Sequence, residues 1–192
     1  MIRGVVLCGG ESKRMGRDKG MLAIGDLTWA EHAAKKLNGL NIPVVVSIKE
    51  KQLNAYDRVF DLTVLKTPTT LVVDQVEVKG PLTGLMSVHL EYPDDDLLLL
   101  ACDMTEMDVP TLQVLKDCAI AFPEFDCYSY VNEDGLLEPL CALYTSTMLK
   151  KLGRDLQDDE LSNFSLRCLI RQASCKTILI NDHRSFNNHN SL

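Results

Sequence analysis

The sequence lacks both an apolar stretch long enough to cross a bilayer and an excess of positive charge. Crossing the hydrocarbon core takes about 20 consecutive apolar residues, and no segment of this 192-residue chain approaches that length. The apolar run Val5–Cys8 is too short for a signal peptide and ends in glycines. The formal charge of −7 argues against general binding to nucleic acid or to a membrane surface, because such binding favours basic chains.

The seven cysteines lack the spacing of a metal site or of a disulfide framework. No two of them form a C-x-x-C pair, and the four histidines form no H-x-x-x-H pattern, so the sequence gives no sign of zinc. Seven cysteines cannot all pair, and most lie in apolar segments, which is typical of buried thiols in a reducing compartment. We therefore expect a cytoplasmic protein. Internal repeats and low-complexity linkers are also absent, which predicts a single domain over residues 1–192.

What is present is a regular alternation of two patterns. Short apolar runs predict strands, and segments of helical periodicity lie between them. The expected strands are 4–7, 44–48, 63–65, 97–101, 127–131 and 177–180, and the expected helices are 29–40, 51–57, 82–91, 109–119, 146–153 and 162–172. This alternation predicts an α/β fold with a mostly parallel central sheet and helices on both faces. The pair Asp134-Gly135 marks a turn, which predicts a small antiparallel excursion within 132–144.

The loop after the first strand combines glycine with positive charge. Gly9 and Gly10 open it, and it carries Lys13, Arg14, Arg17 and Lys19. Glycines after a strand allow backbone N–H groups to approach a phosphate without an intervening Cβ. The G-x-G-x-x-G pattern is absent, and the P-loop pattern is absent too, because Arg17-Asp18 follows Gly16. The loop therefore predicts a phosphate site of another kind, richer in side-chain cations.

Two further segments belong at the same edge of the predicted sheet, since ligands of open α/β sheets bind at the carboxyl ends of the strands. Asp103 directly follows the strand 97–101. Such an acid can cap the next helix, but its position opposite a polyphosphate loop favours a Mg²⁺ ligand. In the segment GPLTG, Gly80 and Pro81 predict a tight bend, and Gly84 leaves room for the close approach of a ligand. The acidic runs 94–96 and 158–160 are expected to be solvated turns.

Taken together, these motifs resemble those of the molybdenum cofactor guanylyltransferase (MobA) family. The segment LCGGESKRMGRDKGML is similar to the family's signature L-x-G-G-x-S-x-R-M-G-x-D-K, and GPLTG, ACDM, EPLCALY and FNNHNS follow in the family's order and spacing. The resemblance implies a Rossmann-like nucleotidyltransferase fold. It implies an enzyme that transfers GMP from GTP to the terminal phosphate of molybdopterin and releases pyrophosphate. The chain departs from the family at Cys8, where alanine is usual, and at Thr105, where proline is common.

The resemblance also implies roles for individual residues. Lys19, Arg14 and Asp103 would be catalytic, with Asp103 holding the Mg²⁺ cofactor. The residues that it implies for GTP binding are Leu7, Cys8, Gly9, Gly10, Gly16, Lys19, Gly80, Gly84 and Asp103. Asn188 and Asn190 would lie on the molybdopterin side. Transient contact with the enzymes that insert or receive the cofactor is implied as well.

Three alternatives stay open. A molybdenum cofactor cytidylyltransferase uses CTP with the same fold and chemistry, and usually reads L-A-A-G where this chain has Leu7–Gly10. A sugar-1-phosphate nucleotidyltransferase is a more distant alternative, because its members generally have an added sugar-binding region. A non-catalytic nucleotide-binding partner would have kept the loop and lost turnover, whereas this chain retains Lys19 and Asp103.

Overall fold

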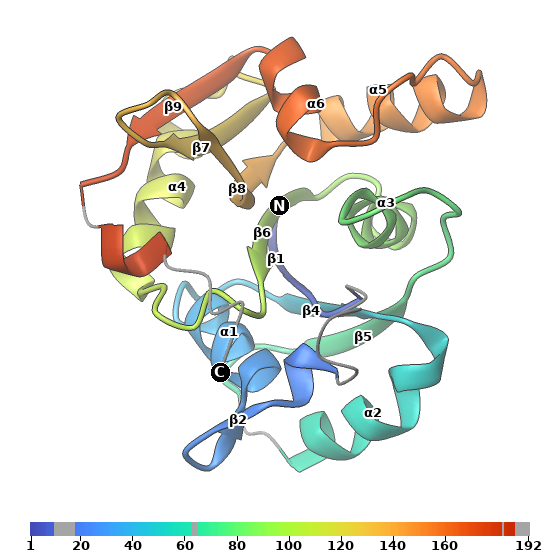
Figure 1. Cartoon of the computed structure of the whole chain (residues 1–192), viewed down its shortest axis with the longest axis vertical. Coiled ribbons are helices and arrows are strands. Elements are labelled where there is room, and N and C mark those ends of the chain that lie inside the picture. The colour runs from blue at the N-terminus through green and yellow to red at the C-terminus, as the bar shows by residue number, and fades with distance from the viewer. Residues whose placement is uncertain (10–17, 63–64, 182, 187–192) are drawn as a thin grey trace.

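A seven-stranded sheet forms the middle of the molecule (Figure 1). The computed structural model describes residues 1–9, 18–62, 65–181 and 183–186. The order of the strands across the sheet is β5-β4-β1-β6-β8-β7-β9. In chain order these strands are β1 (Ile2–Leu7), β4 (Val44–Ile48), β5 (Thr69–Val73), β6 (Asp96–Ala101), β7 (Cys127–Val131), β8 (Leu137–Tyr144) and β9 (Cys175–Leu179).

β8 runs against the direction of the other strands in this sheet. It pairs antiparallel with both β6 and β7, whereas the remaining strand pairs are parallel. The turn that leads into it contains Gly135, whose φ of 77° is a left-handed conformation that glycine adopts without strain. The predicted antiparallel excursion within 132–144 is thereby confirmed. As a consequence, β8 begins at the edge of the sheet where β6 ends.

Helices cover both faces of the sheet, as the alternation of patterns predicts. Successive side chains of a strand point to opposite faces, so Leu98 and Leu100 of β6 pack in one core cluster while Leu97 and Leu99 pack in the other. The first cluster includes residues of α1 (Trp29–Asn38), α2 (Leu53–Leu62) and α4 (Val109–Ala121). The second includes residues of α3 (Leu82–Glu91), α5 (Ser146–Gln157) and α6 (Leu166–Gln172).

The strand that pairs with β4 lies later in the sequence than the predicted strand 63–65, and a small hairpin was not predicted. Residues 63–64 of the expected strand 63–65 lie outside the described part of the chain, and the strand that pairs with β4 is Thr69–Val73. This strand is at the edge of the sheet and buries only Val72, so it lacks the continuous apolar pattern of a central strand. A two-stranded hairpin of β2 (Ala23–Ile24) and β3 (Leu27–Thr28) precedes α1. The described residues also include the short 3₁₀ segments η1 (Lys19–Met21), η2 (Glu50–Gln52) and η3 (His183–Phe186).

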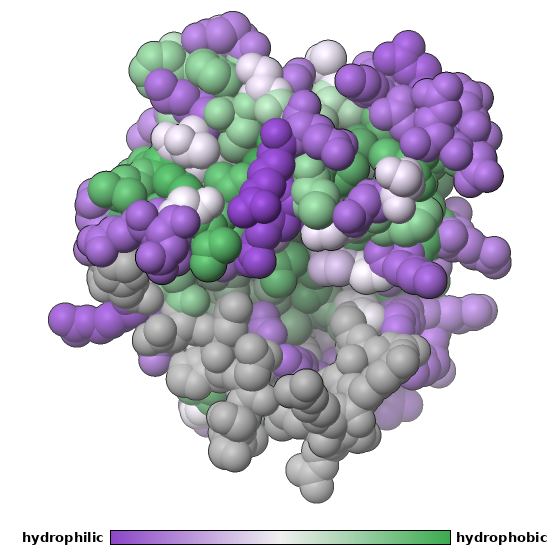
Figure 2. All heavy atoms as spheres, turned by 45° about the horizontal axis from the view of Figure 1, so that its top comes forward, coloured by the Kyte–Doolittle hydropathy of each residue, from purple (hydrophilic) through white to green (hydrophobic). Residues whose placement is uncertain are grey.

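The surface is mixed in character on the face that Figure 2 shows, where hydrophobic and hydrophilic residues alternate in small patches. Hydrophilic residues gather at the upper right, the region in which α5 lies in Figure 1. The acidic run 158–160 directly follows α5 and is exposed, as expected of a solvated turn. None of the helices in the described ranges combines the length and the apolar character that crossing a membrane requires.

Candidate functional site

Four neighbouring parallel strands end at one edge of the sheet, and a polar or glycine residue follows each of them. Cys8 and Gly9 follow β1, and Lys49 follows β4. Asp74 directly follows β5, and Asp103 comes two residues after β6. Because this is the edge at which open α/β sheets bind their ligands, these residues define the candidate site.

Lys19 and Asp103 meet at this edge although 84 residues separate them in the sequence. The Nζ atom of Lys19 lies 3.2 Å from Oδ2 of Asp103 and donates a hydrogen bond to it. Both side chains are partly exposed, at 23% and 18%, so each can be reached by a ligand. The structure thus brings together two of the three residues that we expect to be catalytic; the third, Arg14, lies outside the described residues.

A side chain of α1 stabilises the turn that contains Asp103. Lys36 donates hydrogen bonds from Nζ to the carbonyl oxygens of Met104, at 3.5 Å, and Thr105. Burial lowers the pKa of Lys36, although the acidic side chains of Asp108 and Glu106 partly oppose that effect. Sequence patterns gave no sign of this contact, because Lys36 and Thr105 are 69 positions apart.

Asp74 is an acidic residue of the site that the sequence patterns did not predict. Its Oδ1 atom accepts a hydrogen bond of 2.6 Å from the hydroxyl of Ser47, which is fully buried on β4. Its Oδ2 atom faces Gly9 so closely that a Cβ at position 9 would overlap it. Burial raises the pKa of Asp74, while the Ser47 hydrogen bond and the charge of Lys49 act in the opposite direction. The carboxylate is therefore fixed through one oxygen and has the other directed to the loop after β1.

Glycine suits positions 80 and 84 for two different structural reasons. Gly80 has a φ of 74°, and a Cβ built on it would meet no atom within 4 Å. Gly84 lies on the first turn of α3, where a Cβ would overlap Ser47 Oγ and lie 2.7 Å from Leu7 Cδ2. Gly84 thus allows α3 to approach the sheet closely. That both glycines also lie beside a bound nucleotide stays a prediction.

Leu7 ends β1 and Cys8 follows it, and the two side chains have different surroundings. Leu7 is partly buried and packs in the core cluster beneath α3. The thiol of Cys8 is buried, and both its burial and the neighbouring Cys102 raise its pKa well above the usual value. It is therefore a neutral core side chain, and a nucleotide would contact residue 8 through its backbone. Gly10, Gly16, Asn188 and Asn190, which were also predicted as site residues, lie outside the described residues.

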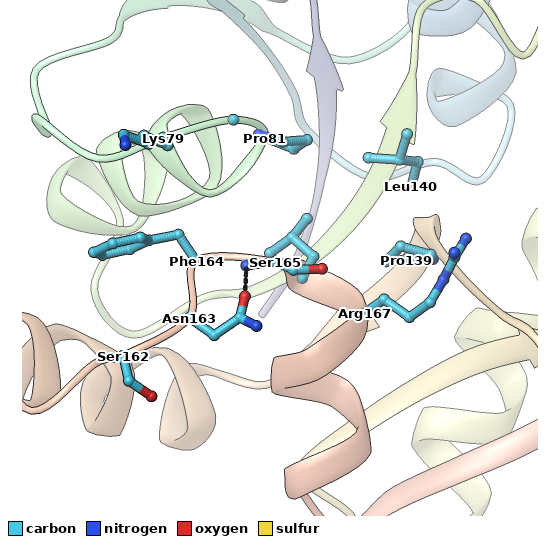
Figure 3. Close-up of a pocket in the computed structure, with 11 residues that line it drawn as sticks. Lys79, Pro81, Pro139, Leu140, Ser162, Asn163, Phe164, Ser165 and Arg167 are labelled. Carbon is cyan, nitrogen blue, oxygen red and sulfur yellow. Dashed lines mark hydrogen bonds between the residues drawn. The ribbon is translucent and has the colours of Figure 1, made fainter.

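A cavity of about 570 Å³ opens beside Gly80 and Pro81, between the starts of α3, β8 and α6 (Figure 3). Arg167 lies along its wall beside Pro139, and its Nε atom donates a hydrogen bond of 3.1 Å to the carbonyl of Leu137. Lys79 lines the opposite part of the cavity. Two cationic side chains thus border a cavity that also has apolar walls.

Glu138 lies next to Pro139 of the cavity wall and feels the charge of Asp103. It lies between Leu137 and Pro139 at the start of β8, the end of that strand nearest to the end of β6. Burial raises the pKa of Glu138, and the negative charge of Asp103 raises it further, whereas Arg167 lowers it. The cavity and the Lys19–Asp103 pair are therefore parts of one edge of the sheet.

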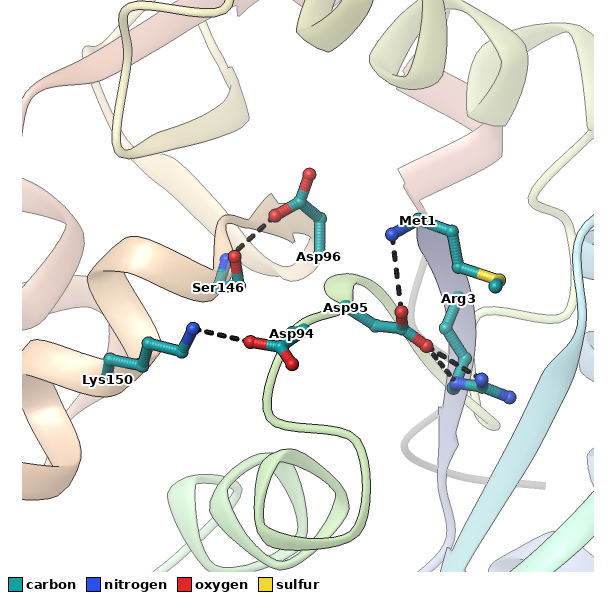
Figure 4. A network of polar contacts seen from close by, with 7 residues as sticks. All are labelled: Met1, Arg3, Asp94, Asp95, Asp96, Ser146 and Lys150. Atoms are coloured by element: carbon teal, nitrogen blue, oxygen red, sulfur yellow. Dashed lines mark hydrogen bonds and ion pairs between the residues drawn. The ribbon is translucent and has the colours of Figure 1, made fainter.

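The acidic run 94–96 lies at the opposite edge and has a structural role (Figure 4). Asp95 is nearly buried and forms an ion pair of 2.7 Å with Arg3, and it also accepts a hydrogen bond from the Met1 amino group. Asp96 accepts a hydrogen bond from the backbone N–H of Ser146 at the start of α5. Only Asp94, which is 86% exposed and pairs with Lys150, fits the predicted solvated turn.

Comparison with known proteins identifies the family. Residues 4–176 match the MobA-like NTP transferase domain. The chain belongs to the MobA-like NTP transferase family. It is 31% identical over 144 residues to the probable molybdenum cofactor guanylyltransferase of Methanothermobacter thermautotrophicus, covering 73% of this chain and 70% of that protein. It is 28% identical over 179 residues to the molybdenum cofactor biosynthesis bifunctional protein of Synechocystis, covering 91% of this chain but only 47% of that relative, so it spans about half of the relative's length.

Solved structures share the fold at lower sequence identity. The molybdopterin-guanine dinucleotide biosynthesis protein A of Archaeoglobus fulgidus superimposes with a TM-score of 0.69 at 16% identity, covering 96% of this chain and 87% of that chain. The manganese complex of Rv0371c from Mycobacterium tuberculosis superimposes with a TM-score of 0.66 at 17% identity, covering 93% and 87%. These similarities establish a nucleotidyltransferase-type fold for the chain.

Proposed function

We propose that the chain is a molybdenum cofactor guanylyltransferase, which transfers GMP from GTP to the terminal phosphate of molybdopterin and releases pyrophosphate. The observation that carries the proposal is the 3.2 Å contact between Lys19 Nζ and Asp103 Oδ2 at the carboxyl edge of the sheet. A cation and a carboxylate side by side suit a metal–triphosphate group, whose phosphates need positive charge and whose metal needs an acidic ligand. Membership in the MobA-like family supports the same assignment.

In the proposed reaction an oxygen of the molybdopterin phosphate attacks the α-phosphorus of GTP. A new P–O bond forms there, and the bond from the α-phosphorus to the bridging oxygen of the β-phosphate breaks, so that pyrophosphate leaves. The attacking phosphate monoester has a second pKa of about 6 and is already largely dianionic at neutral pH, so no general base is required. Lys19 stabilises the negative charge that develops on the leaving group.

Asp103 is the residue that would hold Mg²⁺. Its partly exposed carboxylate is the type of ligand that this ion takes together with substrate phosphates and water. Among the described residues no three His, Cys, Asp or Glu side chains gather into a metal site, which fits an ion that the chain binds with few side chains of its own. When bound, Mg²⁺ would neutralise charge on the triphosphate.

Asp74 is the residue that we propose for the choice of guanine. Guanine presents N1–H and N2–H₂ donors along one edge, and a carboxylate accepts from both. Cytosine places the N3 acceptor beside its N4–H₂ donor, so the same carboxylate would face a lone pair. Since Oδ1 of Asp74 is already engaged by Ser47, Oδ2 is the oxygen that lies toward the loop of Gly9. This arrangement favours GTP over CTP.

The cavity between α3, β8 and α6 is the place that we propose for the molybdopterin side of the reaction. Arg167 and Lys79 would face the anionic groups of the acceptor, and the cavity lies where β8 begins, beside the end of β6 that Asp103 follows. Asn188 and Asn190 stay predicted contributors to that side. Transient contact with enzymes that insert or receive the cofactor is part of the same proposal.

Pyrophosphate release tests the proposal directly. The chain is incubated with Mg²⁺, molybdopterin and each of the four nucleoside triphosphates in turn. We expect turnover with GTP that depends on both the metal and the acceptor. Equal turnover with CTP would assign the chain to the cytidylyltransferases, and GTP binding without any turnover would make it a non-catalytic binding partner.

A further inference from the structure

The carboxylate of Asp18, the residue before Lys19, is held by three hydrogen bonds. Its Oδ1 atom accepts from the backbone N–H of Gly20 and from the hydroxyl of Tyr56, both at 3.0 Å. Its Oδ2 atom accepts from Nε2 of Gln52 at 2.6 Å. Two of these donors come from the segment of η2 and α2, more than 30 positions further along the chain. The local conformation at Lys19 is therefore set by a distant element.

Gln52 uses its whole amide group in this arrangement. Besides its bond to Asp18, Nε2 donates to the carbonyl of Cys8 at 3.2 Å, and Oε1 accepts from the backbone N–H of Lys49 at 2.7 Å. One side chain thus connects the ends of β1 and β4 to Asp18. An amide with two donors and one acceptor in use cannot be replaced by a carboxylate or a hydrocarbon without loss of a bond.

The Tyr56 hydroxyl packs closely against the backbone of Gly20. Tyr56 is fully buried, and a Cβ at position 20 would overlap its hydroxyl. Burial raises the pKa of Tyr56 above its usual value, so the group stays a neutral hydrogen-bond donor to Asp18. Because Gly20 has no side chain, η1 can pack directly against Tyr56 of α2, one residue away from Lys19.

We infer that Gln52 and Tyr56 are positioning residues for Lys19, acting through Asp18. They fix the backbone at residues 18–20, and from that backbone the Lys19 side chain reaches Asp103. This inference rests on the proposed function, because it assigns Lys19 to the triphosphate of the nucleotide. Its consequence is that changes at positions 52 and 56 weaken the contacts to the phosphates of the ligand more than those to its base and ribose.

Gln52→Glu and Tyr56→Phe test the inference, with Gln113→Glu as the matched control. Gln113 also donates from Nε2 to an aspartate, Asp117, at 2.6 Å, but on the exposed surface of α4. Affinities for GTP and for guanosine, which has no phosphates, are measured by calorimetry, together with kcat and KM for pyrophosphate release. We expect both test variants to bind GTP about tenfold more weakly or worse, to lose much less affinity for guanosine than for GTP, and to keep their fold by circular dichroism. The control should match the unmodified chain throughout.

A pH series adds a readout that a purely structural role would not move. Above neutral pH a glutamate at position 52 repels Asp18, whereas after protonation its carboxyl group donates one hydrogen bond to Asp18. The other groups facing this position are Tyr56 and Cys8, both kept neutral because burial raises their pKa values, and the backbone N–H of Lys49. The ratio of GTP affinities between Gln52→Glu and the unmodified chain should therefore recover between about pH 8 and pH 5.5.

The outcomes separate this inference from the proposed function. An unmodified chain that binds no GTP overturns both. An unmodified chain that binds and turns over GTP, with test variants equal to it, overturns the positioning role alone. Equal losses for GTP and guanosine, or an affinity ratio that does not change with pH, would also overturn it, because the substitutions would then act on the site as a whole.

Discussion

The hydroxyl of Ser47 donates a hydrogen bond of 2.6 Å to Oδ1 of Asp74, and it does so from a position without solvent exposure. On its other side Ser47 Oγ faces Gly84, where a Cβ would overlap it. The hydroxyl is thus confined between α3 and the carboxylate. Its direction, and with it the orientation of Asp74, is decided by helix packing.

Removal of this hydroxyl should make guanine binding sensitive to pH. Burial raises the pKa of Asp74, and the Ser47 hydrogen bond opposes that rise, so Ser47→Ala should raise the pKa further. A protonated Asp74 cannot accept from both guanine donors, so GTP affinity should decline as pH falls, beginning at a higher pH in the variant. Calorimetric titrations from pH 8 to pH 5 check this. Identical pH profiles for the two proteins would exclude Asp74 from guanine binding.

The same raised pKa has a consequence for stability. Since Asp74 binds its proton more tightly in the folded chain than in the unfolded chain, its contribution to the free energy of unfolding decreases as pH rises through its folded pKa. Ser47→Ala should make the decrease of the free energy of unfolding with rising pH larger. Denaturant unfolding of both proteins at pH 5 and pH 7 measures the difference, which should be larger in the variant.

Gly9→Ala should lower kcat/KM for GTP and narrow its advantage over CTP. The new Cβ would overlap Oδ2 of Asp74, and the carboxylate would have to turn away from the base. A lost bond to a buried polar partner costs about 1–3 kcal/mol, which corresponds to roughly fivefold to 10²-fold in kcat/KM. The circular dichroism spectrum should be unchanged, since the displaced atom is the end of a side chain. A variant that keeps its preference for GTP would contradict the role of this oxygen.

Asp103→Asn should abolish most turnover while GTP still binds. The substitution keeps the size of the side chain and removes the charge that would hold Mg²⁺, so the rate should fall by about 10²-fold or more. Pyrophosphate release and nucleotide affinity are measured side by side. Turnover close to that of the unmodified chain would remove Asp103 from the proposed metal site.

Lys19→Ala should weaken both GTP binding and turnover. Loss of one oriented charge of this kind commonly costs a few kcal/mol of transition-state stabilisation, or roughly 10²-fold in kcat/KM. Guanosine affinity serves as the control, since it contains no phosphate. If GTP affinity and turnover both survived, Lys19 would be a solvated residue that merely pairs with Asp103.

Asp95→Asn should destabilise the fold without an effect on the site. The substitution leaves Arg3 without its anionic partner at a position where both side chains are only 12% exposed, which should cost about 2 kcal/mol. Chemical denaturation measures this loss. Because Asp95 lies at the opposite edge of the sheet from Asp103, KM for GTP should stay constant under conditions where the chain is folded.

The two acids of the site differ in how well a sequence can predict them. Asp103 follows a continuous apolar run that is buried in full, and such a run is typical of a central strand. Asp74 follows the edge strand β5, which buries only Val72, so the strand was expected several residues too early and the acid after it passed unnoticed. Central strands leave a clear pattern, whereas edge strands depend on the neighbour that they pair with.

Contacts between segments that are distant in the sequence could not be predicted from the sequence, for a different reason. The bonds of Gln52 and Tyr56 to Asp18 span 34 and 38 positions, and nothing in the local pattern around 52–56 distinguishes an amide or hydroxyl directed inward from one in solvent. The pairing of Lys19 with Asp103 was foreseeable only as a shared edge, because both follow strands whose carboxyl ends meet. The distances between these residues and the identity of their hydrogen-bond partners could be read only from the three-dimensional structure.

Because β8 runs in the reverse direction, the residues proposed for nucleotide binding and those proposed for acceptor binding come mainly from different segments of the chain. Gly9, Lys49, Asp74 and Asp103 lie at this edge because they follow the ends of parallel strands, whereas residues 137–140 lie there because β8 begins there. Under the proposed function, the residues that determine selectivity for the nucleotide then lie in the first half of the sequence. The residues that determine selectivity for the acceptor lie mainly in the second half. Exchange of the segment 132–167 between relatives should transfer the preference for an acceptor while GTP selectivity stays with the recipient.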